Sequence, residues 1–110
     1  MTDPIHEKIQ QLVTKTPVLL FMKGTKESPQ CGFSQATVEV LNEIGCPFET
    51  VDVLADEEIR EGVKVFSDWP TIPQLYVGGK FIGGSDIVTE MHTKKELEPL
   101  VKAATGKATS

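Results

Sequence analysis

The 110-residue sequence predicts an α/β domain in which helices flank a four-stranded mixed sheet. A continuous apolar run over 17–22 fits a central strand that is covered on both faces. A helical repeat of apolar residues over 33–44 and an alternating segment over 48–53 follow, which completes a βαβ unit. A further helical repeat over 56–67 leads to two short strands joined by a Gly-Gly turn at 78–79, the pattern of a β-hairpin.

Length and composition limit the class of protein. The length favours one domain over 1–110, with an ordered core over about 5–104 and a flexible tail over 105–110. Eleven basic and sixteen acidic residues give a net charge of −5, which argues against nucleic-acid binding. No stretch has the length of an apolar membrane span, and the N-terminus does not read as a secretory signal. We therefore expect a cytoplasmic protein with free thiols at Cys31 and Cys46.

The helices before and after the first strand have clear boundaries. Asp3-Pro4 predicts a helix start, since Asp is a good cap and Pro suits the first helical position. Gly45 predicts a left-handed cap at the end of the 33–44 helix, and Pro47 prevents its continuation. One face of that helix is expected to consist of Phe33, Thr37, Val40, Leu41 and Ile44.

The C-terminal part continues with a return strand over 80–82, and Gly-Gly-Ser-Asp at 83–86 opens another helix. The sequence Thr-Lys-Lys-Glu at 93–96 fits a capping box for a last helix. In that helix we expect four buried side chains, those of Leu97, Leu100, Val101 and Ala104. The order α-β-α-β-α-β-β-α-α, with a βαβ unit followed by a helix and a hairpin, is a thioredoxin-like layout.

Cys31 stands between the first predicted strand and the helix that follows it. A thiol at a strand-to-helix turn faces the positive end of a helix dipole, which lowers its pKa and makes it a usable nucleophile or metal ligand. A buried structural cysteine is the alternative, but Pro29, Gln30 and Gly32 surround Cys31 with loop residues. The position three residues on, where a redox dithiol has its second sulfur, is Ser34.

Four blocks of this sequence resemble the monothiol glutaredoxins, in the order and spacing of that family and over about 5–104. They are Lys23-Gly24-Thr25 with the loop to Pro29, Cys31-Gly32-Phe33-Ser34, Trp69-Pro70-Thr71-Ile72-Pro73-Gln74, and Gly83-Gly84-Ser85-Asp86. The chain looks like the short, single-domain type. Ser85 stands where many relatives have a second cysteine, which counts against an intramolecular disulfide with Cys31.

The resemblance implies a glutathione site beside Cys31. Lys23 would meet a carboxylate or the charge of the sulfur, and Arg60 would pair with the glycine carboxylate. A cis-proline turn would present backbone groups of the residue before the proline to the ligand. That turn would consist of Thr71, Ile72 and Pro73. The helix opening would bind the γ-glutamyl end through backbone N–H groups and one carboxylate. Its residues would be Gly84, Ser85 and Asp86.

Simpler roles remain open for several of these residues. Lys23 and Arg60 could be solvated cations, and Asp86 could be a helix cap. Phe33 could cover the site or face the core. The resemblance places Trp69 near a dimer or cluster face, whereas an ordinary packed aromatic is equally consistent with the sequence. Cys46 is expected to be a structural or partly buried thiol.

The missing second thiol limits the chemistry. Cys31 cannot close a local disulfide, so turnover would need external glutathione for its second step, unless Cys46 serves as the resolving thiol. A [2Fe–2S] cluster usually needs about four thiolates, and Cys46 is not in ligand spacing with Cys31. The resemblance implies that two chains and two glutathiones supply them, with Cys31 as the metal ligand of each chain.

The resulting hypothesis is a homodimeric carrier that passes a [2Fe–2S] cluster to apo iron–sulfur proteins and acts in iron homeostasis, with BolA-type proteins as further partners. The alternative is a glutathione-dependent oxidoreductase that removes glutathione from protein thiols by a monothiol route. The loop over 25–30 favours the carrier, since dithiol relatives usually have a shorter loop and a longer one would misalign glutathione for reaction.

Overall fold

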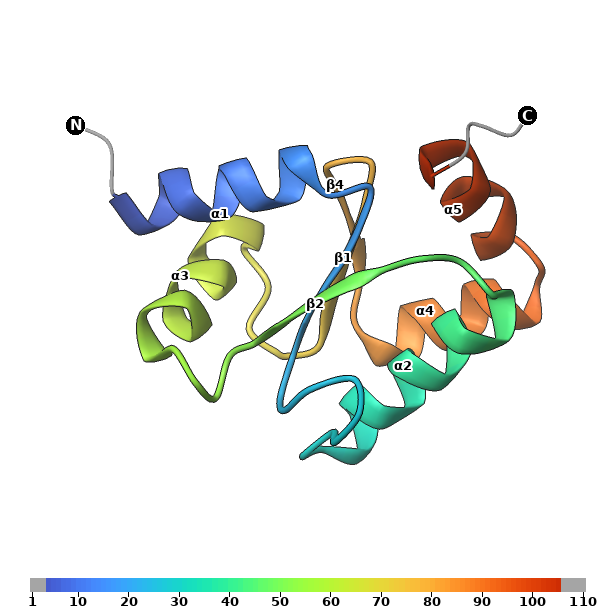
Figure 1. Ribbon diagram of the computed structural model, residues 1–110, viewed down its shortest axis with the longest axis horizontal. Coiled ribbons are helices and arrows are strands. Elements are labelled where there is room, and N and C mark those ends of the chain that lie inside the picture. Colours follow the sequence, from blue (N-terminus) through green and yellow to red (C-terminus); the bar gives the residue numbers. More distant parts are fainter. Residues whose placement is uncertain (1–3, 106–110) are drawn as a thin grey trace.

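A four-stranded mixed sheet lies at the centre of the computed structural model, which describes residues 4–105 (Figure 1). Its strands are β1 (Val18–Met22), β2 (Glu49–Asp52), β3 (Gln74–Val77) and β4 (Lys80–Gly83). They lie in the order β2-β1-β3-β4, with β1 parallel to β2 and the other two pairs antiparallel. The predicted βαβ unit and hairpin are therefore confirmed.

Five helices in the described residues flank this sheet, as the sequence predicts. They are α1 (Pro4–Lys15), α2 (Gly32–Ile44), α3 (Glu57–Ser67), α4 (Ser85–Thr93) and α5 (Leu97–Thr105). The predicted cap Asp3 and residues 106–110 of the tail predicted over 105–110 lie outside the described residues, whereas Thr105 is the last residue of α5. Within them, no helix combines the length and apolar character needed to cross a membrane.

The two faces of the sheet carry two separate cores, because successive side chains of a strand point to opposite faces. Val18, Leu20 and Met22 of β1 pack with buried residues of α2, α4 and α5. Leu19 and Phe21 pack with α1 and α3 on the other face. Figure 1 shows this division, with α1 and α3 on one side of the strands and the other three helices opposite. Strand β1 is buried throughout, as its apolar run predicts.

Helix α2 begins one residue earlier than predicted, at Gly32, which makes Cys31 its N-cap. Its C-cap is Gly45, in the left-handed conformation at φ 81°, and the Gly45 N–H donates to the Leu41 carbonyl. That predicted ending is confirmed. Phe33 departs from the predicted core face, since 63% of its surface is exposed. Ser34 is instead fully buried.

The predicted capping box before the last helix is wrong. Thr93 is the final residue of α4, and α5 starts only at Leu97. Lys95 has a positive φ of 63°, and the N–H of Glu96 donates to the Met91 carbonyl at 2.8 Å. This backbone bond and the left-handed Lys95 end helix α4. Residues 93–96 therefore form the C-terminal end of α4 and not the capping box of α5. Leu100, predicted to be buried, is 44% exposed.

Candidate functional site

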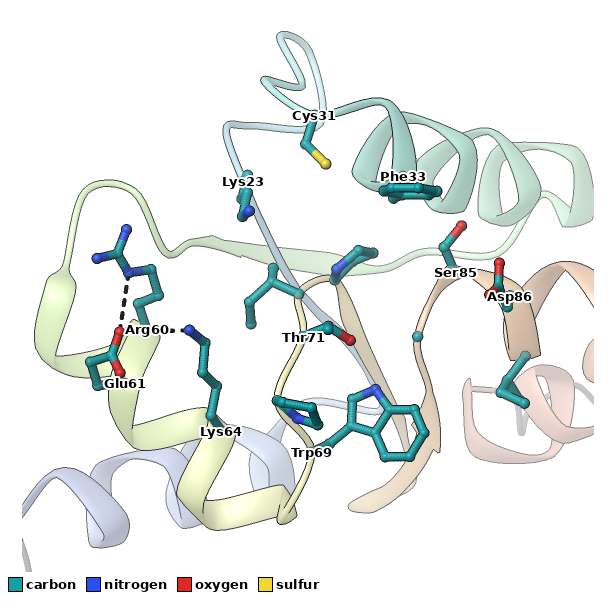
Figure 2. Close-up of a pocket in the computed structure, with 15 residues that line it drawn as sticks. Lys23, Cys31, Phe33, Arg60, Glu61, Lys64, Trp69, Thr71, Ser85 and Asp86 are labelled. Atoms are coloured by element: carbon teal, nitrogen blue, oxygen red, sulfur yellow. Dashed lines mark ion pairs between the residues drawn. The ribbon is translucent and has the colours of Figure 1, made fainter.

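A cavity of about 610 Å³ opens between the start of α2, helix α3, the loop before β3 and the start of α4 (Figure 2). The structure brings all ten sequence-predicted site residues to it. These residues are Lys23, Cys31, Phe33, Arg60, Thr71, Ile72, Pro73, Gly84, Ser85 and Asp86. They come from five separate stretches of the chain, which only the fold brings together.

Cys31 lies at the mouth of this cavity as a free thiol. In Figure 2 its sulfur points into the cavity, with Lys23 on one side and Phe33 on the other. The backbone N–H of Ser34 is the main cause that lowers the pKa of Cys31, and partial burial opposes it. The backbone of Phe33, the charge of Lys23 and the hydroxyl of Ser34 lower the pKa further. Cys31 is thus a thiol poised to act as a thiolate.

Ser34, where the second thiol of a redox pair would stand, has a structural function. Its buried hydroxyl accepts a hydrogen bond of 3.1 Å from the backbone N–H of Lys23. This bond ties the first turn of α2 to the end of β1. Lys23, which follows β1, and Cys31, which precedes α2, are therefore held beside each other.

The loop over 25–30 is closely bonded to its surroundings. The N–H of Gly24 donates to Asp52 Oδ1 at 2.9 Å, and Gln30 N–H donates to the Lys23 carbonyl at 2.9 Å. Lys26 donates to the Phe48 carbonyl at 2.6 Å, and its ammonium lies 4.3 Å from the centre of the Phe48 ring. The loop that precedes Cys31 is therefore fixed to β2.

Gly24 could not be replaced in this loop without strain. Its φ of 92° is in the left-handed region, and an added Cβ would lie 2.6 Å from the Gln30 nitrogen and 2.6 Å from the Ser28 carbonyl oxygen. The glycine of the Lys-Gly-Thr block is thus required by the loop geometry.

The turn over 69–73 forms the floor of the cavity, and its last peptide bond, Ile72–Pro73, is cis as the resemblance implies. The fully buried side chain of Gln74 hydrogen-bonds to this turn. Its Nε2 donates to the carbonyls of Trp69 and Thr71, both at 3.1 Å, and its Oε1 accepts from the Tyr76 hydroxyl at 3.2 Å. A buried amide with every bond satisfied rigidifies its neighbours.

The opening of α4 forms the second side of the cavity. Gly84 is the N-cap, and no side chain caps this helix end. The first-turn N–H groups therefore remain available to an anion. Asp86 lies in this first turn and lines the cavity, so the alternative of a helix cap is not observed. An added Cβ at Gly84 would come within 3.2 Å of the Pro73 carbonyl oxygen, so the helix start packs closely on the turn.

Helix α3 forms the third side and supplies positive charge. Arg60 lines the cavity, and so does Lys64, one turn later. Glu61 lies between them in sequence and forms ion pairs with both side chains (Figure 2). The cavity therefore presents cations on α3, a helix N-terminus on α4 and a thiol between them.

Five lining residues were not in the predicted site, namely Glu61, Lys64, Trp69, Pro70 and Ile87. Trp69 is 40% exposed and its ring centre lies 5.9 Å from that of Phe81, so it both lines the cavity and packs on an aromatic ring. Helical spacing could have indicated Lys64, which stands four residues after Arg60 on the same face.

Comparisons with known proteins agree with this geometry. A family model described as Glutaredoxin matches residues 18–82, more than half of the chain. This chain belongs to the glutaredoxin family. The uncharacterised monothiol glutaredoxin ycf64-like of Synechocystis sp. is 58% identical over 104 residues, which cover 94% of this chain and 97% of that protein. The Cys-Gly-Phe-Ser site, with its single thiol, makes the present chain a monothiol glutaredoxin.

Some relatives of this glutaredoxin are much longer. Mouse Glutaredoxin-3 is 50% identical over 98 residues, which cover 89% of this chain but 29% of the mouse protein. The solution structure of reduced apo GrxS14 from poplar is 48% identical, with a TM-score of 0.78 over 89% of this chain and 90% of that one. The buckwheat glutaredoxin–glutathione complex has a TM-score of 0.83 and 26% identity over 94% of this chain and 93% of that one. The thioredoxin-like fold is thus confirmed.

Proposed function

We propose that this monothiol glutaredoxin binds glutathione in the cavity and, as a homodimer with two glutathiones, carries a [2Fe–2S] cluster to apo iron–sulfur proteins. One observation carries the proposal. The only thiol at the cavity has a lowered pKa, and the position of a resolving thiol is filled by a buried serine that bonds the backbone. Cys31 is therefore open to an external sulfur or iron atom and to no local partner.

The cavity suits glutathione because cations on α3 and the N-terminus of α4 with Asp86 lie on different sides of it, as the glycine and γ-glutamyl ends of the tripeptide require. The glycine carboxylate would pair with Arg60 and Lys64 on α3. The γ-glutamyl carboxylate would receive the N–H groups that open α4, and Asp86 would accept from its ammonium. The central cysteine of the tripeptide would then lie near Cys31, along the backbone of Ile72. The glutathione complex of the buckwheat relative supports this ligand.

The cluster is cargo in this proposal, and its ligands can be counted. No group of three or more His, Cys, Asp or Glu side chains in the described part of the chain could hold a metal ion. Each chain would contribute the thiolate of Cys31, and two glutathiones would complete a set of about four thiolates. At Gly32, an added Cβ would have no neighbour within 4 Å, so the surface beside Cys31 is open to a second chain.

BolA-type proteins would replace one subunit of the dimer, and apo iron–sulfur proteins would receive the cluster. A reducing cytoplasm would keep Cys31 and Cys46 as the free thiols that the structure shows.

Anaerobic reconstitution with iron, sulfide and glutathione tests the carrier function, with visible absorption and molecular mass recorded together. We expect a coloured dimer that loses its colour when glutathione is omitted or when Cys31→Ser is used. Cys46→Ser is the matched control and should keep both colour and dimer. A colourless monomer that rapidly removes glutathione from protein thiols would contradict the proposal.

The second candidate is the monothiol oxidoreductase, which the lowered pKa of Cys31 favours. The Cys31 thiolate would attack the glutathione sulfur of a mixed disulfide, and the protein thiolate would leave and take up a proton. A second glutathione thiolate would then attack the new Cys31–glutathione disulfide, which forms oxidised glutathione and frees the Cys31 thiolate. Turnover of a glutathionylated protein that needs Cys31 and shows no dependence on iron would establish this activity.

A further inference from the structure

The positive side of the cavity carries its own carboxylate. Glu61 Oε2 lies 3.5 Å from Arg60 Nε and 3.6 Å from Lys64 Nζ. Figure 2 shows the carboxylate of Glu61 joined by dashed lines to both cations. One internal anion thus occupies the two charges that a ligand carboxylate would use.

The contacts of Glu61 are ion pairs of poor hydrogen-bonding geometry. Within the described residues, Arg60 Nε is buried and makes no hydrogen bond, although Glu61 is nearby. The Glu61 side chain is also 62% exposed. Exposed ion pairs of this kind contribute little to stability. Glu61 therefore neutralises the two cations without giving Arg60 Nε a hydrogen bond, and a carboxylate that forms shorter bonds could displace it.

We propose that Glu61 is an internal competitor for the carboxylate-binding part of the cavity and so sets its affinity for glutathione. This inference rests on the proposed binding of glutathione. Before the glycine carboxylate can bond Arg60 and Lys64, Glu61 must turn away into water. Its negative charge then stays close to the ligand carboxylate, and like charges at short range oppose binding.

The inference is distinct from a positioning function for Glu61. If Glu61 held Arg60 and Lys64 in the geometry that the ligand needs, its removal would weaken binding. The distances argue otherwise, because 3.5 and 3.6 Å exceed the roughly 2.7–2.9 Å of strong charge-assisted hydrogen bonds. Removal of the competing charge should therefore tighten binding.

The test measures how readily the protein forms a mixed disulfide with oxidised glutathione. The Cys31 thiolate attacks one sulfur, the disulfide bond of oxidised glutathione breaks, and one glutathione leaves as a thiolate that takes up a proton. The equilibrium constant follows from intact mass at fixed ratios of oxidised to reduced glutathione. A Cys46→Ser background leaves Cys31 as the one reporting thiol.

We expect Glu61→Gln to raise this constant about two- to fivefold, the range of one exposed ion pair. The gain should disappear with the glycine ethyl ester of glutathione, which lacks the competing carboxylate. Glu57→Gln is the matched control. Glu57 also pairs with Arg60, at 3.7 Å from Nη2, but it does not contact Lys64 through any ion pair described and does not line the cavity. Glu57→Gln should therefore change the equilibrium constant for mixed-disulfide formation less than Glu61→Gln does.

The outcomes separate this inference from the function on which it rests. A constant for Glu61→Gln that is unchanged, lowered, or raised equally for the ester would overturn the competitor function while the glutathione site stands. If neither the Cys46→Ser background nor its Glu61→Gln variant forms a mixed disulfide at Cys31, the glutathione site is overturned and this inference with it. Thermal unfolding of both variants checks that the fold is intact.

Discussion

The two ends of helix α2 each carry a cysteine, and their environments differ. Cys31 is the N-cap, where backbone N–H groups of the first turn, led by Ser34, lower its pKa. Cys46 follows the C-cap Gly45, and burial raises the pKa of Cys46. Its Sγ lies 3.9 Å from the Leu41 carbonyl oxygen, which can only accept a hydrogen bond.

The difference shows that place along a helix decides what a thiol can do. Unpaired N–H groups and the positive end of the dipole favour a thiolate at Cys31. Burial raises the pKa of Cys46, against the opposing effect of its own backbone, and favours the protonated thiol, which packs against the core beneath α2. Cys46 is thus the partly buried thiol that the sequence predicts.

The largest expected effect is on thiol reactivity. At pH 7, iodoacetamide should modify Cys31 faster than Cys46, since the thiolate is the reactive form and the pKa of Cys31 is lowered while that of Cys46 is raised. Peptide mass mapping over time measures both rates. Cys31→Ser should remove the fast reaction and Cys46→Ser should leave it unchanged. Equal rates at the two sites would contradict the comparison.

Ser34→Ala tests what supports the N-terminal end of α2. The Lys23 N–H would lose its buried acceptor, which costs about 1–3 kcal/mol in the free energy of unfolding. The pKa of Cys31 should rise only slightly, because the backbone N–H of Ser34 is the larger cause and remains. Urea unfolding and the pH dependence of alkylation measure the two effects.

Thr14→Ala, which removes an exposed hydroxyl, is the control for Ser34→Ala and should change stability little. Loss of the lowered pKa without loss of stability in Ser34→Ala would show that the hydroxyl acts on the sulfur and not on the backbone.

Much of this fold was predictable from the sequence because its elements follow local periodicity. The buried run of β1, the Gly45 cap and the Gly-Gly hairpin each depend on nearby residues only. The capping box at 93–96 failed because backbone bonds that end α4 used the same residues. Phe33 fits the periodicity of α2, yet the cavity lies where its side chain points.

The candidate site was predictable only where the family resemblance supplied it. Lys64 and Glu61 read as solvated charges on an amphipathic helix, and only the fold turns that face to the cavity. Gln74 reads as one strand residue, whereas in the structure its side chain bonds two carbonyls of the turn and the hydroxyl of Tyr76. Ser34 reads as a missing thiol, and its bond to Lys23 depends on how β1 and α2 meet.

Alanine at the two glycines near the ends of α2, its first residue Gly32 and its C-cap Gly45, should have different effects. Gly45 has a φ of 81°, so Gly45→Ala forces a strained backbone and costs about 1 kcal/mol. Gly32 lies in the first turn with open space around it, so Gly32→Ala should be neutral or stabilise by up to about 1 kcal/mol. Urea unfolding of both variants measures this. Destabilisation by Gly32→Ala of the same size would contradict the assignment of the two ends.

The smallest effect is the pH dependence of stability, where the two cysteines should act in opposite directions. The folded pKa of Cys31 lies below the ordinary thiol value of 9.0, so its contribution is present above that value and is lost as pH falls through the folded pKa. Cys46 has the reverse effect because its folded pKa is raised. As pH rises through the ordinary value of 9.0, Cys46 ionises first in the unfolded chain, so its contribution to stability is lost. Between pH 7 and about 10, the stability of the wild type relative to Cys31→Ser should therefore rise, and relative to Cys46→Ser it should fall. Urea unfolding across this range measures both differences, and slopes of the same sign would contradict the opposite environments of the two ends of α2.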